Sequence, residues 1–203
     1  MGLFDKLFQG NKIEIASPVN GQIVPISHVS DPTFSEEMVG KGVAIIPSDG
    51  KFYSPADGTL VSLFPTGHAF CLNTVDGAEV LVHIGIDTVK LKGEFFNTIA
   101  TQGATVKKGD LIVEVDLDGV KNAGYEIITP IVVANYGKFS KLDRNTGSVN
   151  SGDAAITDSR VRSFLTGLLS LVEKDVLPSL QQSHPYSQAL YCTLYGLSST
   201  AYS

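Results

Sequence analysis

Residues 64–87 read FPTGHAFCLNTVDGAEVLVHIGID. Two segments rich in β-branched and apolar residues flank Asp76-Gly77, the dipeptide type that most strongly predicts a tight hairpin turn. A regular hairpin closed by this dipeptide places His83 opposite Phe70. It also brings His68 and His83 to one face as diagonal neighbours, roughly 7–8 Å apart at the backbone. A one-residue bulge would separate the two histidines, so their meeting depends on a regular register.

Short β-type segments of the same kind recur through residues 13–156, with Gly, Pro and Asp between them. Regular short strands separated by turn signals predict an all-β fold, an antiparallel β-sandwich or a barrel-like arrangement. Helical patterning is scarce in this part of the chain, and residues 94–100 are the best candidate for a short helix. The clearest strand segments are residues 23–26, 43–46, 59–63, 80–86, 111–115 and 131–134.

Two partial internal echoes suggest that this β architecture is doubled. PVNGQIV at residues 18–24 resembles PADGTLV at residues 55–61, and VKKGD at residues 106–110 resembles VNSGD at residues 149–153. Asn-Gly and Asp-Gly favour tight turns because Gly readily takes a positive φ and Asn and Asp tolerate it. Turn residues recur in every β protein, so coincidence is the competing explanation.

The chain divides into three parts: residues 1–12, residues 13–157 and residues 158–203. The first part begins MGLFDKLF, whose apolar residues have helical spacing, so it is either a frayed terminus or a weak membrane-surface helix at residues 1–8. The third part is an appendage of unknown role with a predicted amphipathic helix near residues 160–177. The apolar stripe of that helix consists of Val161, Phe164, Leu165, Leu168, Leu169 and Val172.

Composition and charge indicate the kind of partner and the cellular compartment that suit this protein. The 203 residues carry a formal net charge of −6, and no basic cluster suits nucleic acid, so a partner with a basic contact face fits better. Cys71 and Cys192 lie far apart, and no stretch reads as a signal peptide, which favours a reducing, cytoplasmic setting. No apolar run approaches the roughly 20 residues that cross a bilayer.

The predicted histidine pair admits two kinds of chemistry. A neutral imidazole is a good nucleophile toward phosphorus near neutral pH, and a second imidazole can donate a hydrogen bond to the phosphoryl oxygens. A zinc site is the alternative, but zinc usually takes three or four protein ligands, and Asp87 is the one nearby candidate beside His68 and His83. The competing structural explanation is that one or both histidines merely occupy the sheet surface.

A longer signature surrounds the histidines. VHIGIDTVKLKGE at residues 82–94, TGHAF at 66–70, SPADGT at 54–59, VKKGD at 106–110 and TPIV at 129–132 stand in this order around them. Together they resemble the glucose-family IIA component of the bacterial phosphoenolpyruvate-dependent sugar phosphotransferase system, over roughly residues 13–157. The resemblance implies an antiparallel β-sandwich built from a duplicated hybrid motif.

The resemblance also implies a role for each site residue. His83 would accept a phosphoryl group from the phosphocarrier protein HPr, as a tele-phosphohistidine, and pass it to the cysteine of a sugar-permease IIB domain. His68 would stabilise the phosphoryl group and Thr66 would orient His68. No cofactor and no metal is required for this relay, although His68 and His83 could become zinc ligands in a partner complex. The protein would be a transferase component without independent turnover of a small substrate.

The implied partner surface combines apolar and acidic residues. Phe34, Phe70 and Leu81 would form its apolar part, and Asp31 and Asp87 would meet basic residues of HPr. The permease, with its IIB and IIC domains, would be the second partner. Transporters and glycerol kinase are further regulatory targets that the resemblance suggests.

This sequence departs from the family pattern at several positions. Lys90 stands where the enteric regulatory proteins carry an acidic residue, which leaves the regulatory interactions open. GEFF at residues 93–96 replaces the usual Gly-Glu-Gly-Phe, and residues 141–148 depart from the usual spacing. The segment from Asp158 onward does not resemble the family pattern.

Three other functions remain compatible with the sequence. A biotinyl or lipoyl carrier domain shares the VKKGD type of turn, but it needs a lysine at a hairpin tip, typically beside methionine, and the methionines here are Met1 and Met38. A metal-dependent hydrolase would use His68, His83 and Asp87. A purely regulatory relative would present its histidines to partners without passing the group onward. The sequence names neither the sugar nor the oligomeric state.

Overall fold

The computed structural model describes residues 13–139 and 141–158. The predicted membrane-surface segment at residues 1–8 and the predicted helix near residues 160–177 lie outside the described residues. The last described strand, β14 (Ala154–Asp158), runs one residue past the predicted boundary at Thr157. No helix within the described ranges is long and apolar enough to span a membrane.

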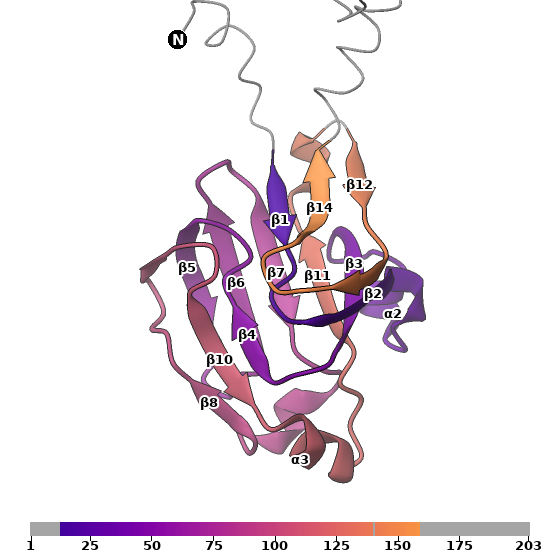
Figure 1. The fold of residues 1–203 in the computed structure, drawn as a ribbon, viewed down its shortest axis with the longest axis vertical. Coiled ribbons are helices and arrows are strands. Elements are labelled where there is room, and N and C mark those ends of the chain that lie inside the picture. The colour runs from indigo at the N-terminus through magenta and orange to yellow at the C-terminus, as the bar shows by residue number, and fades with distance from the viewer. Residues whose placement is uncertain (1–12, 140, 159–203) are drawn as a thin grey trace, which may run out of the picture. The chain divides into compact units, whose positions relative to one another are not determined.

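Most strands belong to one antiparallel sheet of eight (Figure 1). Its order is β13-β2-β3-β11-β7-β6-β5-β9, so β7, which ends at His83, lies near the middle. The six strand segments expected from the sequence all appear as strands, each within a few residues of its predicted ends. The bounds are β2 (Gly21–Pro25), β3 (Lys41–Pro47), β5 (Gly58–Leu63), β6 (Ala69–Thr74), β7 (Glu79–His83), β9 (Thr105–Val106), β11 (Thr129–Val133) and β13 (Gly147–Val149).

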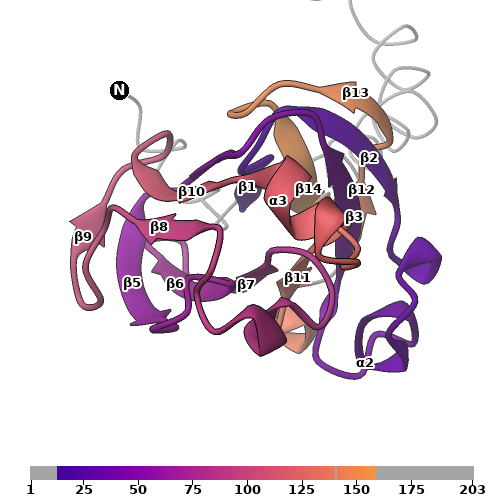
Figure 2. The ribbon, with the colours of Figure 1, turned by 90° about the horizontal axis from the view of Figure 1, so that it is seen from below.

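Two three-stranded sheets complete the fold. One has the order β1-β14-β12 and the other β4-β10-β8, and all their pairings are antiparallel. Figure 2 shows β10 and β14 on the other side of the molecule from β6 and β7. The predicted fold class, an antiparallel β-sandwich, is therefore confirmed. The added strands are β1 (Glu14–Ala16), β4 (Lys51–Tyr53), β8 (Phe96–Thr98), β10 (Leu111–Val115) and β12 (Leu142–Arg144).

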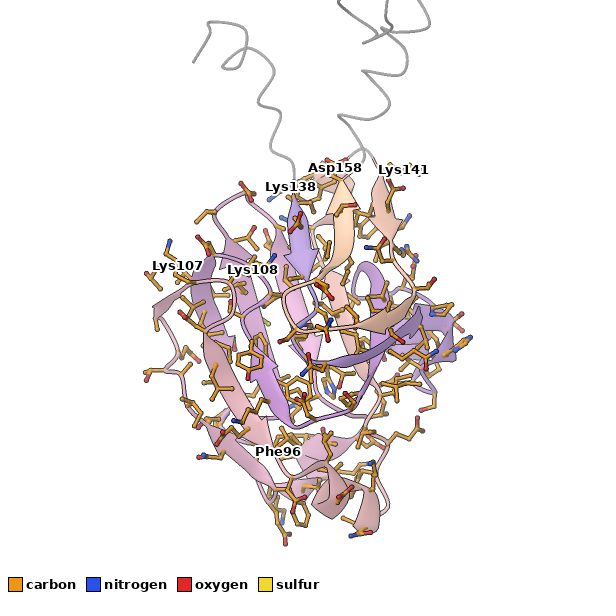
Figure 3. The ribbon with its side chains drawn as sticks, in the orientation of Figure 1. Phe96, Lys107, Lys108, Lys138, Lys141 and Asp158 are labelled. Atoms are coloured by element: carbon orange, nitrogen blue, oxygen red, sulfur yellow. The ribbon has the colours of Figure 1, made fainter. Side chains whose placement is uncertain are left out.

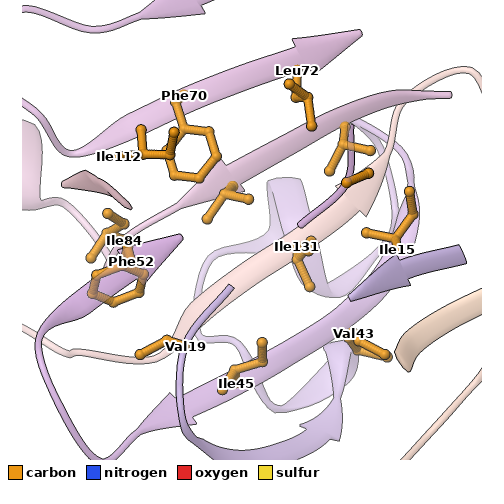
Figure 4. Packing of buried hydrophobic residues seen from close by; sticks show 14 of the residues in the cluster. Ile15, Val19, Val43, Ile45, Phe52, Phe70, Leu72, Ile84, Ile112 and Ile131 are labelled. Carbon is orange, nitrogen blue, oxygen red and sulfur yellow. The ribbon is translucent and has the colours of Figure 1, made fainter. Parts of the chain in front are cut away.

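The core lies between these sheets (Figure 4). It is built from branched aliphatic residues and two phenylalanines, Phe52 and Phe70, neither of which is exposed. Each fully buried side chain of this kind stabilises the fold by about 1.5–3 kcal/mol relative to exposure. All five residues of β11 are buried, because other parts of the chain cover both of its faces.

The internal echoes occupy equivalent places in the hydrogen-bond network. The Ser17 hydroxyl and the Ser54 hydroxyl each donate to the main-chain carbonyl two residues further on, at 2.6 and 2.7 Å. The Ser17 amide donates to the carbonyl of Asp153 at 2.7 Å, and the Ser54 amide donates to the carbonyl of Asp110 at 2.8 Å. The two halves of the fold therefore repeat one local design, which supports the predicted duplication.

The predicted register of the central hairpin is wrong by one residue. Thr74 and Ala78 close the turn with an amide-to-carbonyl hydrogen bond of 2.9 Å, and Gly77 takes a φ of +86° within a three-residue loop. His83 consequently pairs with Ala69 instead of Phe70. Asp76-Gly77 still forms the turn, but Val75 joins it, and every pairing along β6 and β7 shifts with it.

This register also removes Phe70 from the predicted partner surface. Phe70 pairs with Val82, and both side chains are fully buried in the core. A partner protein cannot contact a side chain with 0% exposure. The prediction that Phe70 helps to dock partners is therefore wrong, because the one-residue shift turns its side chain to the inner face.

The predicted helix at residues 94–100 is also wrong. Phe96–Thr98 forms strand β8, which pairs with β10. Lys92 and Phe95 both take positive φ values, of 56° and 74°, and such left-handed residues interrupt a right-handed helix. The helical segments that the sequence did not predict are α2 (Pro32–Ser35), α3 (Leu117–Asn122) and the 3₁₀ segments η1 (Ile26–His28), η2 (Thr88–Leu91) and η3 (Tyr136–Lys138).

The two lysines of the VKKGD turn, labelled in Figure 3, form ion pairs with Asp57, just before β5, and with Glu14 on β1. The Lys107 ammonium lies 3.0 Å from Asp57, and the Lys108 ammonium lies 3.1 Å from Glu14. The amide of Lys108 also donates to Asp57, which lowers the pKa of that carboxyl group. These lysines therefore have a structural use in tying the turn to the fold, which weakens the carrier-domain interpretation.

Candidate functional site

The two histidines lie close together, as the sequence predicted, but the strand register that brings them together differs from the predicted one. His83 is the last residue of β7 and pairs with Ala69, the first residue of β6. His68 precedes β6 and follows Gly67, whose φ of +70° turns the chain, so strand alternation does not direct the His68 side chain. The two ring centroids are 5.1 Å apart, with the rings at 75° to one another.

A main-chain carbonyl determines which nitrogen of His83 is available. The Nδ1 atom of His83 lies 2.7 Å from the carbonyl oxygen of Gly85. A carbonyl oxygen only accepts hydrogen bonds, so Nδ1 carries the proton and Nε2 keeps its lone pair. The Nε2 atom is therefore the nucleophilic position of this ring.

His68 is held in a similar way by a side chain. Its Nδ1 atom lies 2.5 Å from the Thr66 hydroxyl, which is the contact that the resemblance implied. The Phe64 ring packs on His68 with centroids 5.0 Å apart, and only 6% of His68 is exposed. Phe64 is not among the site residues predicted from the sequence, although it stands two residues before Thr66 and is exposed enough to contact a partner.

Burial favours the uncharged form of both rings at neutral pH by lowering the pKa of each. Burial lowers the pKa of His68 to about 4, and charge repulsion from His83 contributes to this shift. Burial also lowers the pKa of His83, although the hydrogen bond to Gly85 and the negative charges of Asp31 and Asp87 act in the opposite direction. An imidazole that is neutral at pH 7 is competent as a nucleophile without first losing a proton.

Phe34 forms an apolar wall beside His83. The two ring centroids are 5.3 Å apart, and Phe34 is 5% exposed. The short helix α2 carries this phenylalanine, and it begins at Pro32 because the Asp31 side chain accepts the amide of Thr33 at 2.8 Å. Asp31 therefore shapes the helix that supports the site, in addition to its charge effect on His83.

The remaining predicted partner residues lie at the edge of the site. Leu81 is half-buried, and it packs against the small apolar cluster that contains Phe34. Asp87 is exposed and takes a left-handed conformation with a φ of 61°. Its carboxylate lies 2.6 Å from the Lys90 ammonium in an exposed ion pair, so the residue that departs from the family pattern competes with basic partner residues for a predicted docking charge.

Among the described residues, the side chains do not gather into a metal centre. No group of three or more His, Cys, Asp or Glu residues suited to a metal ion occurs among the described residues, and His68, His83 and Asp87 do not form one. Since zinc sites usually take three or four protein ligands, this geometry disfavours the metal-dependent hydrolase. The two-histidine zinc role in a partner complex stays a prediction.

Known proteins share both the sequence and the fold of this chain. Residues 13–139 match the family model described as phosphoenolpyruvate-dependent sugar phosphotransferase system, EIIA 1. The glucose-specific EIIA component of Haemophilus influenzae is 43% identical over 161 residues, covering 77% of this chain and 97% of that protein. The glucose permease IIA of Mycoplasma capricolum superposes with a TM-score of 0.70 at 38% identity, over 77% of this chain and 99% of that one.

Other relatives carry the same part within longer proteins. The beta-glucoside-specific EIIBCA component of Halalkalibacterium halodurans is 44% identical over 152 residues, which cover 74% of this chain but 24% of that protein. The chain thus spans about a quarter of the length of this relative. The family model, these relatives and the shared β-sandwich show that the chain belongs to the EIIA 1 family of the phosphoenolpyruvate-dependent sugar phosphotransferase system, a family of phosphocarriers.

Proposed function

We propose that His83 is the phosphoryl acceptor of this phosphocarrier, taking the group from HPr and passing it to the cysteine of a sugar-permease IIB domain. The hydrogen bond from His83 Nδ1 to Gly85 carries this proposal, because it leaves the Nε2 lone pair available beside His68. Longer relatives, the beta-glucoside-specific EIIBCA component of Halalkalibacterium halodurans and the glucosamine-specific EIICBA component of Bacillus subtilis, support IIB and IIC domains as the receiving partner.

The transfer exchanges one P–N bond for another. The Nε2 lone pair of His83 attacks phosphorus, and the bond from phosphorus to the donor imidazole breaks, returning its electron pair to the donor. Because Nδ1 keeps its proton, the His83 ring gains positive charge as the new bond forms. The Gly85 carbonyl, at 2.7 Å from Nδ1, stabilises that charge without any rearrangement.

His68 acts in this proposal as the donor to the phosphoryl oxygens. If the Thr66 hydroxyl donates to Nδ1 of His68, the proton of that neutral ring sits on Nε2 and can be offered to the phosphoryl group. Thr66 is then a positioning residue that sets the tautomer of His68. The proposed transfer requires no metal, and such fixed donors would stabilise the charge on the phosphoryl oxygens.

The partner surface combines an apolar wall with an acidic edge. Phe34, Leu81 and Phe64 supply apolar surface around the rings, and they keep water away from the phosphohistidine. Asp31 and Asp87 supply negative charge for basic residues of HPr. The protein turns over no small substrate alone, and it works in the cytoplasm, where HPr and the IIB domain meet it.

A phosphoryl-uptake experiment tests this proposal. The protein is incubated with phosphoenolpyruvate, enzyme I and HPr, and its intact mass is recorded. We expect wild type to gain one acid-labile phosphoryl group, His83→Ala to gain none, and His68→Ala to gain it but pass it poorly to a IIB domain. His28→Ala is the matched control, since His28 is an exposed histidine on η1. Uptake by His83→Ala equal to that of wild type would contradict the proposal.

A further inference from the structure

The chain after β7 is held by a series of hydrogen bonds. Each of the three consecutive peptide groups from His83 to Ile86 is anchored by a hydrogen bond. The Ile84 amide donates to the carbonyl of His68 at 2.7 Å, and the Ile84 carbonyl accepts the Thr88 hydroxyl at 2.6 Å. The Ile86 amide donates to the carbonyl of Glu126 at 3.0 Å.

These hydrogen bonds orient the Gly85 carbonyl, which contacts His83. The Gly85 carbonyl and the Ile86 amide belong to one planar trans peptide group, so they point in opposite directions. Holding the Ile86 amide on Glu126 therefore turns the Gly85 oxygen away from Glu126 and toward Nδ1 of His83. The preceding peptide group, between Ile84 and Gly85, is held by Thr88.

Gly85 itself can adopt this conformation only because it lacks a side chain. Its φ is +71°, and an added Cβ would lie 2.6 Å from the Glu126 carbonyl oxygen and 2.6 Å from the Thr88 methyl carbon. A glycine is conformationally permissive, so without external bonds it would sample other orientations. Contacts with neighbouring residues are therefore needed to fix the backbone conformation of Gly85.

We propose that Thr88 is a positioning residue for phosphoryl transfer, which locks the Ile84–Gly85 peptide group and thereby keeps the proton of His83 on Nδ1. Thr88 is fully buried, and it is the side-chain member of the three anchors, the other two being main-chain carbonyls. It acts through Ile84 and Gly85, with its hydroxyl on one carbonyl and its methyl group against the glycine. This inference rests on the proposed role of His83.

The tautomer of His83 provides a direct readout in the unphosphorylated protein. Thr88→Val removes the hydroxyl and keeps the branched shape, whereas Thr88→Ser keeps the hydroxyl and removes the methyl group. We expect ¹⁵N NMR of wild type to show His83 as the Nδ1–H form, Thr88→Val to show a mixture of both tautomers, and Thr88→Ser to restore the wild-type pattern. If Thr88→Val does not fold, Thr88→Ala replaces it in the same comparison.

Transfer kinetics give the second readout. We expect the rate constant of phosphoryl uptake at saturating HPr to fall about tenfold in Thr88→Val, with KM for HPr unchanged, because misplaced reacting groups cost rate rather than docking. Ser17→Ala is the matched control. Ser17 is likewise buried, and its hydroxyl also donates to a main-chain carbonyl, at 2.6 Å, but in the turn between β1 and β2.

The outcomes separate this inference from the proposed function. An unchanged tautomer and a rate within twofold of wild type in Thr88→Val would overturn the role of Thr88. An equal loss of rate in Ser17→Ala would also overturn it, since it would reveal general destabilisation. Failure of wild type to take up phosphate would instead remove the proposed function, while the NMR result on the loop would stand.

Discussion

Burying the His68 imidazole in this site has an energetic cost. The ring is moved from water into a setting where 6% of the residue is exposed, and its pKa falls from 6.5 to about 4. Thr66, Phe64 and His83 surround it, and none of these contacts offers a negative charge to a protonated ring. The site therefore holds His68 in its neutral form at the expense of stability in acid.

This shift makes a prediction about stability and pH. Between pH 6.5 and about 4 the unfolded chain binds a proton at His68 that the folded protein does not. The free energy of unfolding should therefore fall as the pH decreases through this window, by an amount on the order of 2–3 kcal/mol from His68 alone. Urea denaturation of wild type and His68→Gln at pH 7 and pH 4.5 measures it.

Carboxylates titrate in the same window, but they do so in both proteins. The difference between wild type and His68→Gln thus isolates the histidine. The variant should lose less stability on acidification than wild type. Parallel pH profiles for the two proteins would show that His68 is protonated as readily in the folded protein as in the unfolded chain.

At the scale of elements, the β6–β7 hairpin shows why a strand can be predicted while its register cannot. The alternation of apolar and polar residues locates both strands, and Asp76-Gly77 locates the turn. The choice between a two-residue and a three-residue loop depends on the Thr74–Ala78 hydrogen bonds and on Gly77 with its φ of +86°. That choice moves Phe70 from the predicted partner surface into the core.

The turn itself can be tested by substitution. Gly77→Ala should lower the free energy of unfolding by about 1–2 kcal/mol, because a left-handed conformation costs this much for a residue with a Cβ. An added Cβ at Gly77 meets nothing within 4 Å, so the effect is one of backbone conformation alone. Phosphoryl uptake should stay unchanged, since the histidines lie at the other end of the hairpin.

Gly137→Ala is the matched control for this turn. A Cβ at Gly137 also meets nothing within 4 Å, but its φ is not in the left-handed region. We expect its free energy of unfolding to stay within about 0.5 kcal/mol of wild type, as surface substitutions usually do. Equal losses of stability in the two variants, measured by urea denaturation, would argue against the strained-turn explanation.

At the scale of the whole molecule, the sandwich is stabilised by a core to which both halves of the duplicated pattern contribute. Ile131 on β11 is fully buried near the centre of the large sheet, whereas Ile46 on β3 is 43% exposed. Truncation of a buried isoleucine removes buried surface and leaves a cavity. The two positions therefore offer the same chemical change in opposite environments.

Ile131→Ala should lower the free energy of unfolding by about 2–5 kcal/mol. Ile46→Ala should lower it by less than about 1 kcal/mol, since much of this side chain already contacts water. Thermal and urea unfolding followed by circular dichroism would measure both. A loss for Ile46→Ala as large as that for Ile131→Ala would show that the arrangement of the sheets differs from the one described.

The all-β class, the six strand segments, the doubled pattern and the candidate histidines can be predicted from the sequence, because alternation and turn chemistry are local properties of the chain. The hairpin register, the strand at Phe96–Thr98 and the burial of Phe70 depend on tertiary contacts. Such contacts also decide the reactive nitrogen of His83, since the orientation of the Gly85 carbonyl depends on Glu126, far along the chain. Within one segment these alternative conformations differ little in free energy, and only contacts between distant segments select among them.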